Sequence, residues 1–189
     1  MHVHLRYLAQ QFLLAAFLFS VALLPRVLAL GDFLTADEYR WLDRSRDFLI
    51  WIARGDLAAT LRTGHPGVTT MWTGSMGILY KYWTRPPSAP DDLLAFVQQV
   101  SSEPIGAGYI APIRFPTALL VSLFIVVYYM LLSRLFGDRR PGVVGALLLA
   151  LNPFYIALSR VLHHDALAAT FMALSLLPLL GYWFQSWSR

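Results

Sequence analysis

Four long stretches without a charged residue constrain this chain more than any other feature of its sequence. Residues 7–25, 115–133 and 141–159 each hold 19 consecutive positions without Asp, Glu, Lys or Arg, and residues 166–188 hold 23. Each stretch is rich in Leu, Ala, Val and Phe. Because a helix needs about 20 apolar residues to cross the hydrocarbon core of a bilayer, each stretch is long enough to span a membrane.

The composition points the same way. Of the 189 residues, 57% are hydrophobic and only 14% are charged, with a mean hydropathy of +0.54, which is too little charge for an ordinary globular surface. We therefore predict a single all-α domain, a polytopic membrane helical bundle of four transmembrane helices. The expected spans lie near residues 8–30, 110–136, 141–158 and 165–186, and prolines in or beside the apolar runs predict kinks.

The first apolar stretch can be interpreted as a signal peptide or as a retained membrane anchor. Val27-Leu28-Ala29 is a poor small-x-small cleavage site, which favours the anchor. The short loop 137–141 contains Arg139-Arg140, and short basic loops lie on the cytoplasmic side. We expect a multi-pass plasma-membrane protein with a cytoplasmic amino terminus and with residues 31–109 and 159–165 outside.

Two amphipathic helices are predicted in the outer loop 31–109, followed by a short helix at 91–100. The second should begin at Pro66 and run toward Trp83. Helices of this kind lie along a membrane surface. The expected apolar faces are Trp41, Ser45, Phe48, Leu49 and Ile52 in the first helix, and Val68, Met71, Trp72, Met76, Leu79 and Trp83 in the second.

Two adjacent carboxylates, Asp37 and Glu38, follow the first span directly. In a structural interpretation, Thr35 caps a helix, Glu38 completes a capping box, and Asp37 is stabilised by the helix dipole. In a functional interpretation, one carboxylate is a general base that removes a proton from an acceptor hydroxyl. The two interpretations are compatible, because a capped helix start holds a catalytic group rigidly.

A second cluster, His163-His164-Asp165, precedes the last span. Asp165 can be the N-cap of that span, with the histidines as wetted loop residues. Alternatively, the three side chains ligate a divalent metal or contact phosphate. The chain contains no cysteine, so thiolate ligands and disulfides are excluded.

Positive charge near the outer interface can stabilise a phosphate leaving group. Arg114, which we expect to open the second span, and Arg160 are candidates for this role, and His65 before Pro66 can point into the same site. Each has a structural alternative, because interfacial arginines commonly extend to lipid phosphate and His65 can be a turn residue. The arginines are scattered, with no long basic run, so we expect membrane lipids and no nucleic acid as partners.

In order and sidedness, these features resemble the C-type membrane glycosyltransferases, in particular dolichyl-phosphate-mannose protein mannosyltransferases and lipid A aminoarabinose transferases. The resemblance implies a polyprenyl-phosphate sugar donor, a protein, lipid or glycan acceptor, and an inverting displacement on the outer face, without an organic cofactor. It makes Asp37 the base and Asp165 the second acid, with Glu38 as a further candidate. The features are Asp37-Glu38, His65-Pro66, Arg114, Asn152-Pro153, and Ser159-Arg160 followed by Asp165.

One departure from that family leaves other functions open. Its members usually have more spans, so we expect this chain to be an amino-terminal portion of a longer glycosyltransferase. A lipid-headgroup transporter would carry ionisable residues inside its spans, and the four apolar runs contain none away from their ends. A non-catalytic assembly subunit would use the outer helices to dock a partner.

Overall fold

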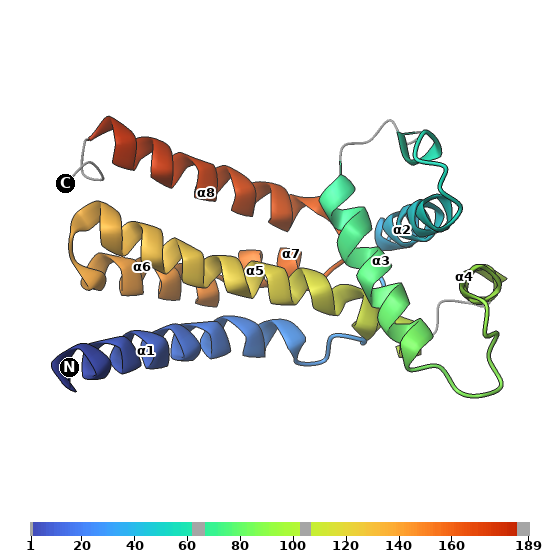
Figure 1. Ribbon diagram of the computed structural model, residues 1–189, viewed down its shortest axis with the longest axis horizontal. Helices are drawn as coiled ribbons and strands as arrows, with labels where there is room; N and C mark the ends of the chain where they lie inside the picture. Colours follow the sequence, from blue (N-terminus) through green and yellow to red (C-terminus); the bar gives the residue numbers. More distant parts are fainter. Residues whose placement is uncertain (1, 62–66, 103–106, 185–189) are drawn as a thin grey trace.

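The computed structural model describes residues 2–61, 67–102 and 107–184, and within these ranges it is helical and contains no strand. The predicted all-α membrane helical bundle is confirmed. Helices α1, α5, α6 and α8 run along the long axis of the molecule, and α2, α3 and α4 lie together at one end (Figure 1). The elements are α1 (His2–Val27), α2 (Glu38–Ala53), η1 (Ala59–Leu61), α3 (Val68–Trp83), α4 (Leu93–Ser102), α5 (Ala107–Phe136), α6 (Arg139–Leu151), α7 (Pro153–Ser159) and α8 (His164–Trp183).

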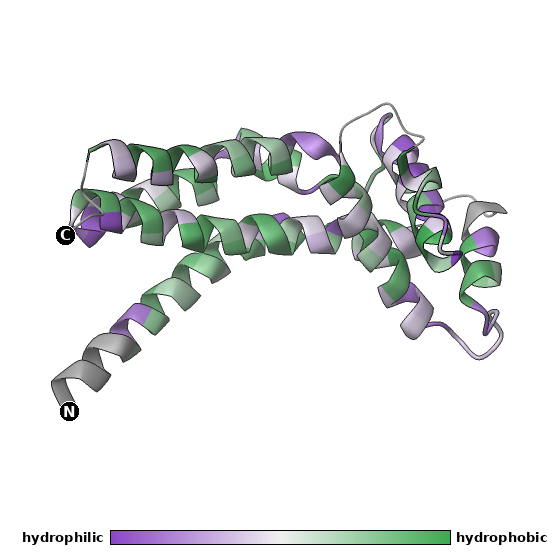
Figure 2. Ribbon diagram, turned by 45° about the horizontal axis from the view of Figure 1, so that its top comes forward, coloured by the Kyte–Doolittle hydropathy of each residue, from purple (hydrophilic) through white to green (hydrophobic). Residues whose placement is uncertain are grey.

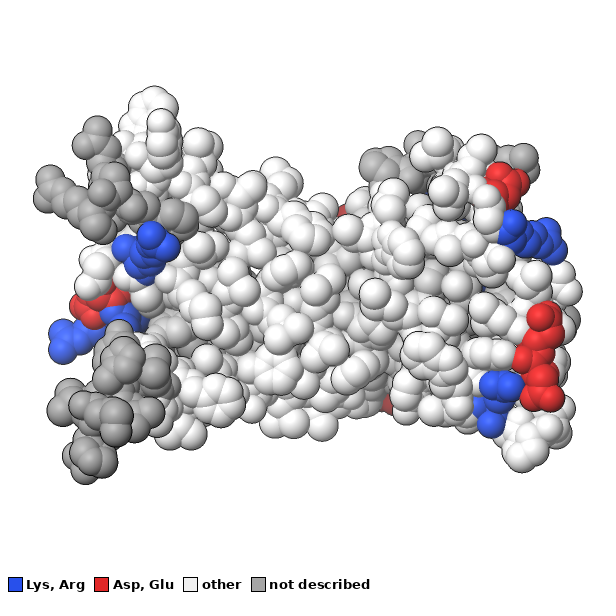
Figure 3. Space-filling model, viewed as in Figure 1, with Lys and Arg blue, Asp and Glu red and all other residues white. Residues whose placement is uncertain are grey.

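Among the described residues, three helical segments are long and apolar enough to cross a membrane, namely Ala9–Val27, Gly108–Phe136 and His164–Trp183. They correspond to the first, second and fourth predicted spans. Hydrophobic residues dominate these helices (Figure 2). Figure 3 shows charged side chains gathered toward the two ends of the molecule, with a largely uncharged belt between them. This distribution is what a bilayer around the belt requires.

The predicted third span, 141–158, is two helices, because α6 and α7 meet at a bend of 63° and pass as a span only together. Pro153 has no N–H to continue the hydrogen bonding of α6. The side chain of Asn152 accepts a hydrogen bond from the Tyr155 N–H at 2.9 Å and so caps the new helix. The kink expected at Pro153 is therefore confirmed.

Arg26, in the last turn of α1, stabilises this bend. Its side chain is fully buried, and Nη1 donates to the Ala150 carbonyl at 3.1 Å, with a longer contact of 3.5 Å from Nη2 to the Leu149 carbonyl. The Leu149 carbonyl is the one that would accept from residue 153 in an unbroken helix. Arg26 thus supplies a donor where Pro153 removes one, and its positive charge suits the carboxyl end of α6.

Small residues allow the spans to pack closely in the apolar belt. Ala22, Ala146, Ala150 and Ala166 are each fully buried in the core between α1, α5, α6 and α8. A Cβ on Gly142 would lie 2.7 Å from the Tyr129 carbonyl oxygen of α5. Small side chains at helix contacts are typical of membrane bundles, where close backbone approach provides much of the association energy.

A layer at one end of the spans is formed by α2 and α3 over the amino-terminal end of α5. Four residues of the predicted apolar face of α2 are buried and Ile52 is half-buried, and this face packs against α3 and Ile113 of α5. It therefore faces protein and does not face lipid. A Cβ on Gly77 of α3 would lie only 2.4 Å from the Ile113 Cα, so the two helices approach at a position that needs glycine.

Helix α3 has the opposite arrangement. Of its predicted apolar face, Met71 is buried, but Val68, Trp72, Met76 and Trp83 are exposed. The face that packs on protein instead consists of small and hydroxyl-bearing residues, together with Met71 and Ile78. This leaves an exposed apolar stripe, which agrees with a helix at a membrane surface. The predicted start at Pro66 lies outside the described residues. The residues that α3 buries are Thr70, Met71, Thr73, Gly74, Ser75, Gly77 and Ile78.

Candidate functional site

The site is built around the turn that opens α2. The Glu38 side chain reaches back to the Thr35 N–H, with Oε2 accepting at 2.8 Å, and it also accepts from the Thr35 hydroxyl at 3.0 Å. This is the Glu38 half of the predicted capping box. In the other half the Thr35 hydroxyl would accept from the Glu38 N–H, but here the hydroxyl donates to Glu38 and the Glu38 N–H donates to the Thr35 carbonyl at 3.1 Å. The N-cap position of α2 belongs to Asp37, so the prediction of Thr35 as N-cap is wrong.

Glu38 is also paired with Arg114 in the interior of the protein. Arg114 Nε donates to Oε1 at 2.8 Å and Nη2 donates to Oε2 at 2.7 Å, and the two side chains are only 2% and 4% exposed. The Leu162 N–H adds a bond of 2.8 Å to Oε1. A single carboxylate therefore joins α2, α5 and the segment between α7 and α8.

These contacts decide the protonation of Glu38. Burial raises the pKa of the Glu38 carboxyl, but the hydrogen bonds from Arg114, Thr35 and Leu162 and the charge of Arg114 together lower it below its ordinary value. The carboxylate is thus held ionised and its lone pairs are occupied. A group in this state is suited to fixing geometry and poorly suited to accepting a proton.

We expected Arg114 to open its helix, and this prediction is wrong. Arg114 lies two turns inside α5, which begins at Ala107. Besides Glu38, it donates to the Leu30 carbonyl at 2.6 Å and to the Phe33 carbonyl. It therefore clamps the chain that leaves α1. With 4% of its side chain exposed, the guanidinium has almost no surface for a phosphate in this arrangement.

Arg160 is engaged in a similar way. Its Nη2 donates to the Leu28 carbonyl and, at 3.0 Å, to the Ala29 carbonyl. These groups lie just after α1, where Ala29 has a φ of 53°, a conformation that L-residues rarely adopt. Arg160 thus helps to hold this turn. Its predicted contact with a phosphate stays a prediction.

Asp37 has a very different environment from its neighbour. Its side chain is 65% exposed, and its closest charged partner is Arg40 at 3.9 Å. It precedes α2 without a capping hydrogen bond from its side chain. Of the two adjacent carboxylates, Asp37 is the one that a substrate can reach.

The predicted His163-His164-Asp165 cluster is present at the start of α8. His163 Nδ1 lies 3.1 Å from one Asp165 carboxylate oxygen, and His164 Nε2 lies 3.3 Å from the other. One ligand atom from each residue falls within 4.8 Å of the other two. The N-cap position belongs to His163, so the interpretation of Asp165 as N-cap is wrong; Asp165 lies in the first turn.

Trp41 of α2 connects this cluster to the Asp37 turn. Its ring lies 5.8 Å from the His163 ring and 5.1 Å from the His164 ring, and Arg44 stacks on it at 4.7 Å. The sequence predicted Trp41 only as part of the apolar face of a membrane-surface helix and did not single out Arg44. Their roles depend on contacts between segments more than a hundred residues apart, which no local pattern reveals.

The structure therefore brings the start of α2 and residues 160–165 to one corner, as their predicted sidedness required. Glu38 contacts Leu162 directly, and Trp41 contacts both histidines. Arg114 and Arg160 lie beneath this corner as clamps. The other predicted site residue, His65, lies outside the described residues.

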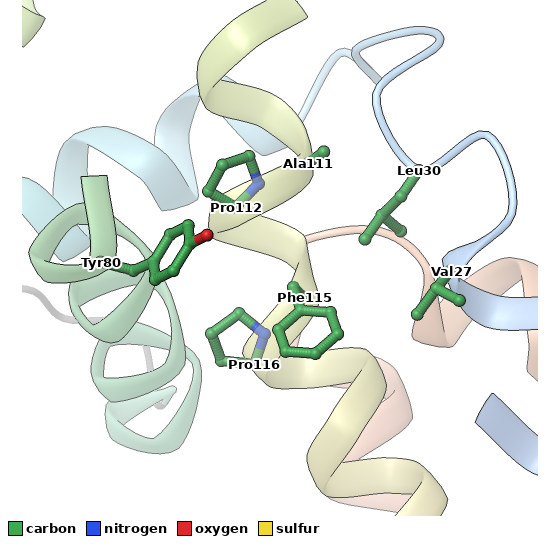
Figure 4. A pocket seen from close by; sticks show the side chains of 7 residues that line it. All are labelled: Val27, Leu30, Tyr80, Ala111, Pro112, Phe115 and Pro116. Atoms are coloured by element: carbon green, nitrogen blue, oxygen red, sulfur yellow. The ribbon is translucent and has the colours of Figure 1, made fainter. Parts of the chain in front are cut away.

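An apolar groove of about 430 Å³ adjoins this corner. Its walls come from the end of α1, the amino-terminal end of α5 and Tyr80 of α3, whose hydroxyl is directed toward α5 (Figure 4). Leu30 lines the groove while its carbonyl accepts from Arg114, so groove and site share a structural element. The lining residues are Val27, Leu30, Tyr80, Ala111, Pro112, Phe115 and Pro116.

Comparison with protein families gives one assignment. Residues 92–187 match the family described as dolichyl-phosphate-mannose-protein mannosyltransferase, a range that includes α5 to α8, Arg114 and the His163-His164-Asp165 cluster. No curated protein and no solved structure matches the chain. Because the matched range covers just over half of the chain, this multi-pass membrane protein belongs to the dolichyl-phosphate-mannose-protein mannosyltransferase family of glycosyltransferases.

Proposed function

We propose that the protein takes part in transfer of a sugar from a polyprenyl-phosphate donor to an acceptor hydroxyl, with Asp37 as the general base. Asp37 removes the proton of the hydroxyl as its oxygen bonds to the anomeric carbon. The bond from that carbon to the phosphate oxygen breaks, and polyprenyl phosphate leaves with the electron pair. Attack opposite the leaving group inverts the anomeric configuration. The family assignment supports the donor class, and the site geometry supports the base.

The observation that carries this proposal is the different environment of two adjacent carboxylates. Glu38 is buried and its oxygens are occupied by Arg114, Thr35 and Leu162, whereas Asp37 is exposed at the same helix start. Two carboxylates held in contrasting environments are a common basis for separate catalytic roles. Glu38 then fixes the turn and Asp37 meets the acceptor.

The phosphate and the lipid tail of the donor need different surroundings. Arg40 and Arg44 carry positive charge near Asp37 and Trp41, which suits a phosphate. The groove beside Leu30 and Tyr80 offers an apolar wall for a hydrocarbon chain. We propose that the tail lies in this groove and the sugar phosphate extends from it toward Asp37.

The proposed side of the membrane is the outer face. The opposite ends of the spans carry the turn between α5 and α6, where Arg139 and Arg140 follow Asp138. Short basic connections are cytoplasmic under the positive-inside rule. Asp37 and Asp165 then lie outside, in a multi-pass plasma-membrane protein with its amino terminus inside.

A transporter function would require an ionisable group available to a substrate within the spans. Arg26 is fully buried near the end of α1, but it is engaged with carbonyls of α6 and lies 5.3 Å from the Tyr155 ring. This engagement favours a structural role. The structure therefore offers no specific support for transport over glycosyl transfer.

The test measures sugar release from a panel of polyprenyl-phosphate donors by the complete gene product in detergent. Asp37→Asn should reduce turnover by at least a hundredfold, because removal of a general base typically costs 10²–10⁴-fold. Asp43→Asn, a partly exposed carboxylate later in α2, should retain turnover. Wild-type turnover by Asp37→Asn would refute the assignment of the base.

A further inference from the structure

The structure leaves the developing phosphate charge without the arginines that the sequence proposed for it. Arg114 is buried against Glu38 and two carbonyls, and Arg160 is engaged with the carbonyls after α1. A phosphate leaving group needs positive charge close to it. Arg40 and Arg44 lie near Asp37 and Trp41, and a further cation at this corner would add to their charge.

We infer that His163, His164 and Asp165 bind one divalent transition-metal ion, which faces the donor phosphate. Two imidazoles and one carboxylate are the ligand set of catalytic zinc sites and of sites that take several divalent transition metals. Three protein ligands leave at least one coordination position open. The role of this ion in contacting the donor phosphate rests on the proposed function, whereas metal binding itself does not.

The distances suit such an ion. Ligand atoms bound at about 2.1 Å in a tetrahedron lie about 3.4 Å apart. His163 Nδ1 and His164 Nε2 lie 3.1 and 3.3 Å from the two Asp165 oxygens, and one ligand atom from each residue falls within 4.8 Å of the others. The remaining separation, between the two histidine ligand atoms, is at most 4.8 Å. It therefore needs only a small side-chain rotation to close around one ion.

The surroundings also suit a site with one side open to a substrate. Trp41, which is 3% exposed, forms an apolar wall against both imidazoles, and an apolar shell of this kind limits access of water to a metal. The side chains of His163, His164 and Asp165 remain 22%, 34% and 48% exposed. The amino end of α8 disfavours a cation through its dipole, and the Asp165 carboxylate offsets this effect.

The direct test is metal binding by the 189-residue chain in detergent, without a sugar donor. The chain is stripped with a chelator and titrated with Co²⁺, whose visible absorption reports its coordination, and then with Zn²⁺ in competition. We expect one ion per chain, and binding at least tenfold weaker in each of His163→Gln, His164→Gln and Asp165→Asn.

The matched control is Asp43→Asn, which removes a carboxylate on the outer helix α2 that pairs with Arg46 at 3.0 Å. This variant should bind the ion as the wild type does, and circular dichroism should show the same helix content in all of the variants. No binding by a folded wild-type chain, or equal binding by Asp165→Asn and wild type, would overturn the site.

A second assay separates the metal inference from the proposed function. Sugar transfer by the complete gene product should fall when the ion is removed and recover when it is returned. Transfer that survives removal of the ion and all three substitutions, but is lost in Arg40→Gln or Arg44→Gln, would overturn the metal role and leave glycosyl transfer standing. Metal binding with no transfer to any acceptor would instead refute the proposed function and retain the site.

Discussion

The buried pair of Glu38 and Arg114 should dominate the stability of the layer that α2 and α3 form at one end of the spans. Glu38→Gln keeps the shape of the side chain and one acceptor oxygen, but it leaves the buried Arg114 guanidinium without its counter-charge, with only neutral oxygens such as the Leu30 and Phe33 carbonyls as partners. Breaking one side of a buried ion pair costs about 3–5 kcal/mol. We therefore expect the free energy of unfolding to fall by about 3 kcal/mol, which is more than a hundredfold in the unfolding equilibrium constant.

Removing both charges should cost less than the sum of the two single changes. In Glu38→Leu with Arg114→Leu, no uncompensated charge remains in the interior, and replacement of a buried pair by apolar residues is often close to neutral. The three carbonyl and N–H groups at Leu30, Phe33 and Leu162 still lose partners, so the double variant should stay below wild type. The coupling energy should reach about 2 kcal/mol or more.

The assay is reversible unfolding of the chain in mixed detergent micelles, followed by circular dichroism, for wild type, both single variants and the double variant. The control is Asp43→Asn, which breaks a pair at 3.0 Å whose side chains are 22% and 51% exposed. A surface pair of this kind contributes about 0–1 kcal/mol. A loss below about 1 kcal/mol in Glu38→Gln, or additive effects in the cycle, would refute the view of Glu38 as the junction of three segments.

Three further predictions concern stability. The pKa of Glu38 in the folded protein is held below its ordinary value of 4.5, so the contribution of Glu38 to stability is complete above pH 4.5 and is lost as the pH falls through that lower folded-state pKa. Thermal melts across pH 3–7 should show this loss of stability at acid pH in wild type and a flatter profile in Glu38→Gln. Gly77→Ala places a Cβ 2.4 Å from the Ile113 Cα and should cost about 1–3 kcal/mol by forcing α3 and α5 apart, whereas Gly108→Ala, with open space around it, should be neutral or stabilising in the same unfolding assay. Arg26→Met should cost about 1–3 kcal/mol, because it leaves buried carbonyls at the α6 bend without donors; a smaller loss in Arg26→Lys would support the hydrogen-bonding role, and unchanged stability in Arg26→Met would contradict it.

Hydropathy was sufficient to locate three long apolar helices, because a bilayer constrains the length and apolar character of any helix that crosses it. It could not predict how α3 is oriented. In a soluble protein the apolar face of α3 would be buried. Here Trp72 and Trp83 face outward, while Gly74 and Gly77 allow the close approach to α2 and α5. The solvent next to an outer helix decides which face packs on protein.

Sequence order placed Asp37, Glu38 and Asp165 on one side of the membrane but could not divide their roles. The partner of Glu38 is Arg114, 76 residues away, and it lies inside a helix that begins earlier than its charge pattern suggested. An arginine near an interface can bind phosphate or hold the fold. The backbone carbonyls that accept hydrogen bonds from Arg114 and Arg160 show that both arginines hold the fold in this structure.

The contrast between Asp37 and Glu38 follows from helix geometry. Consecutive residues on a helix are rotated by about 100°, so the Glu38 side chain can turn inward to Arg114 while the side chain of Asp37, at the N-cap position before it, leaves the interior and is 65% exposed. Burial of Glu38 and exposure of Asp37 are therefore compatible at one helix start. Because the buried carboxylate also holds α5 and the Leu162 segment, the same contacts that fix the start of α2 bring the residues before α8 to this corner. A substitution at Glu38 should consequently disturb both carboxylates of the site, even though Glu38 itself has no surface for a substrate.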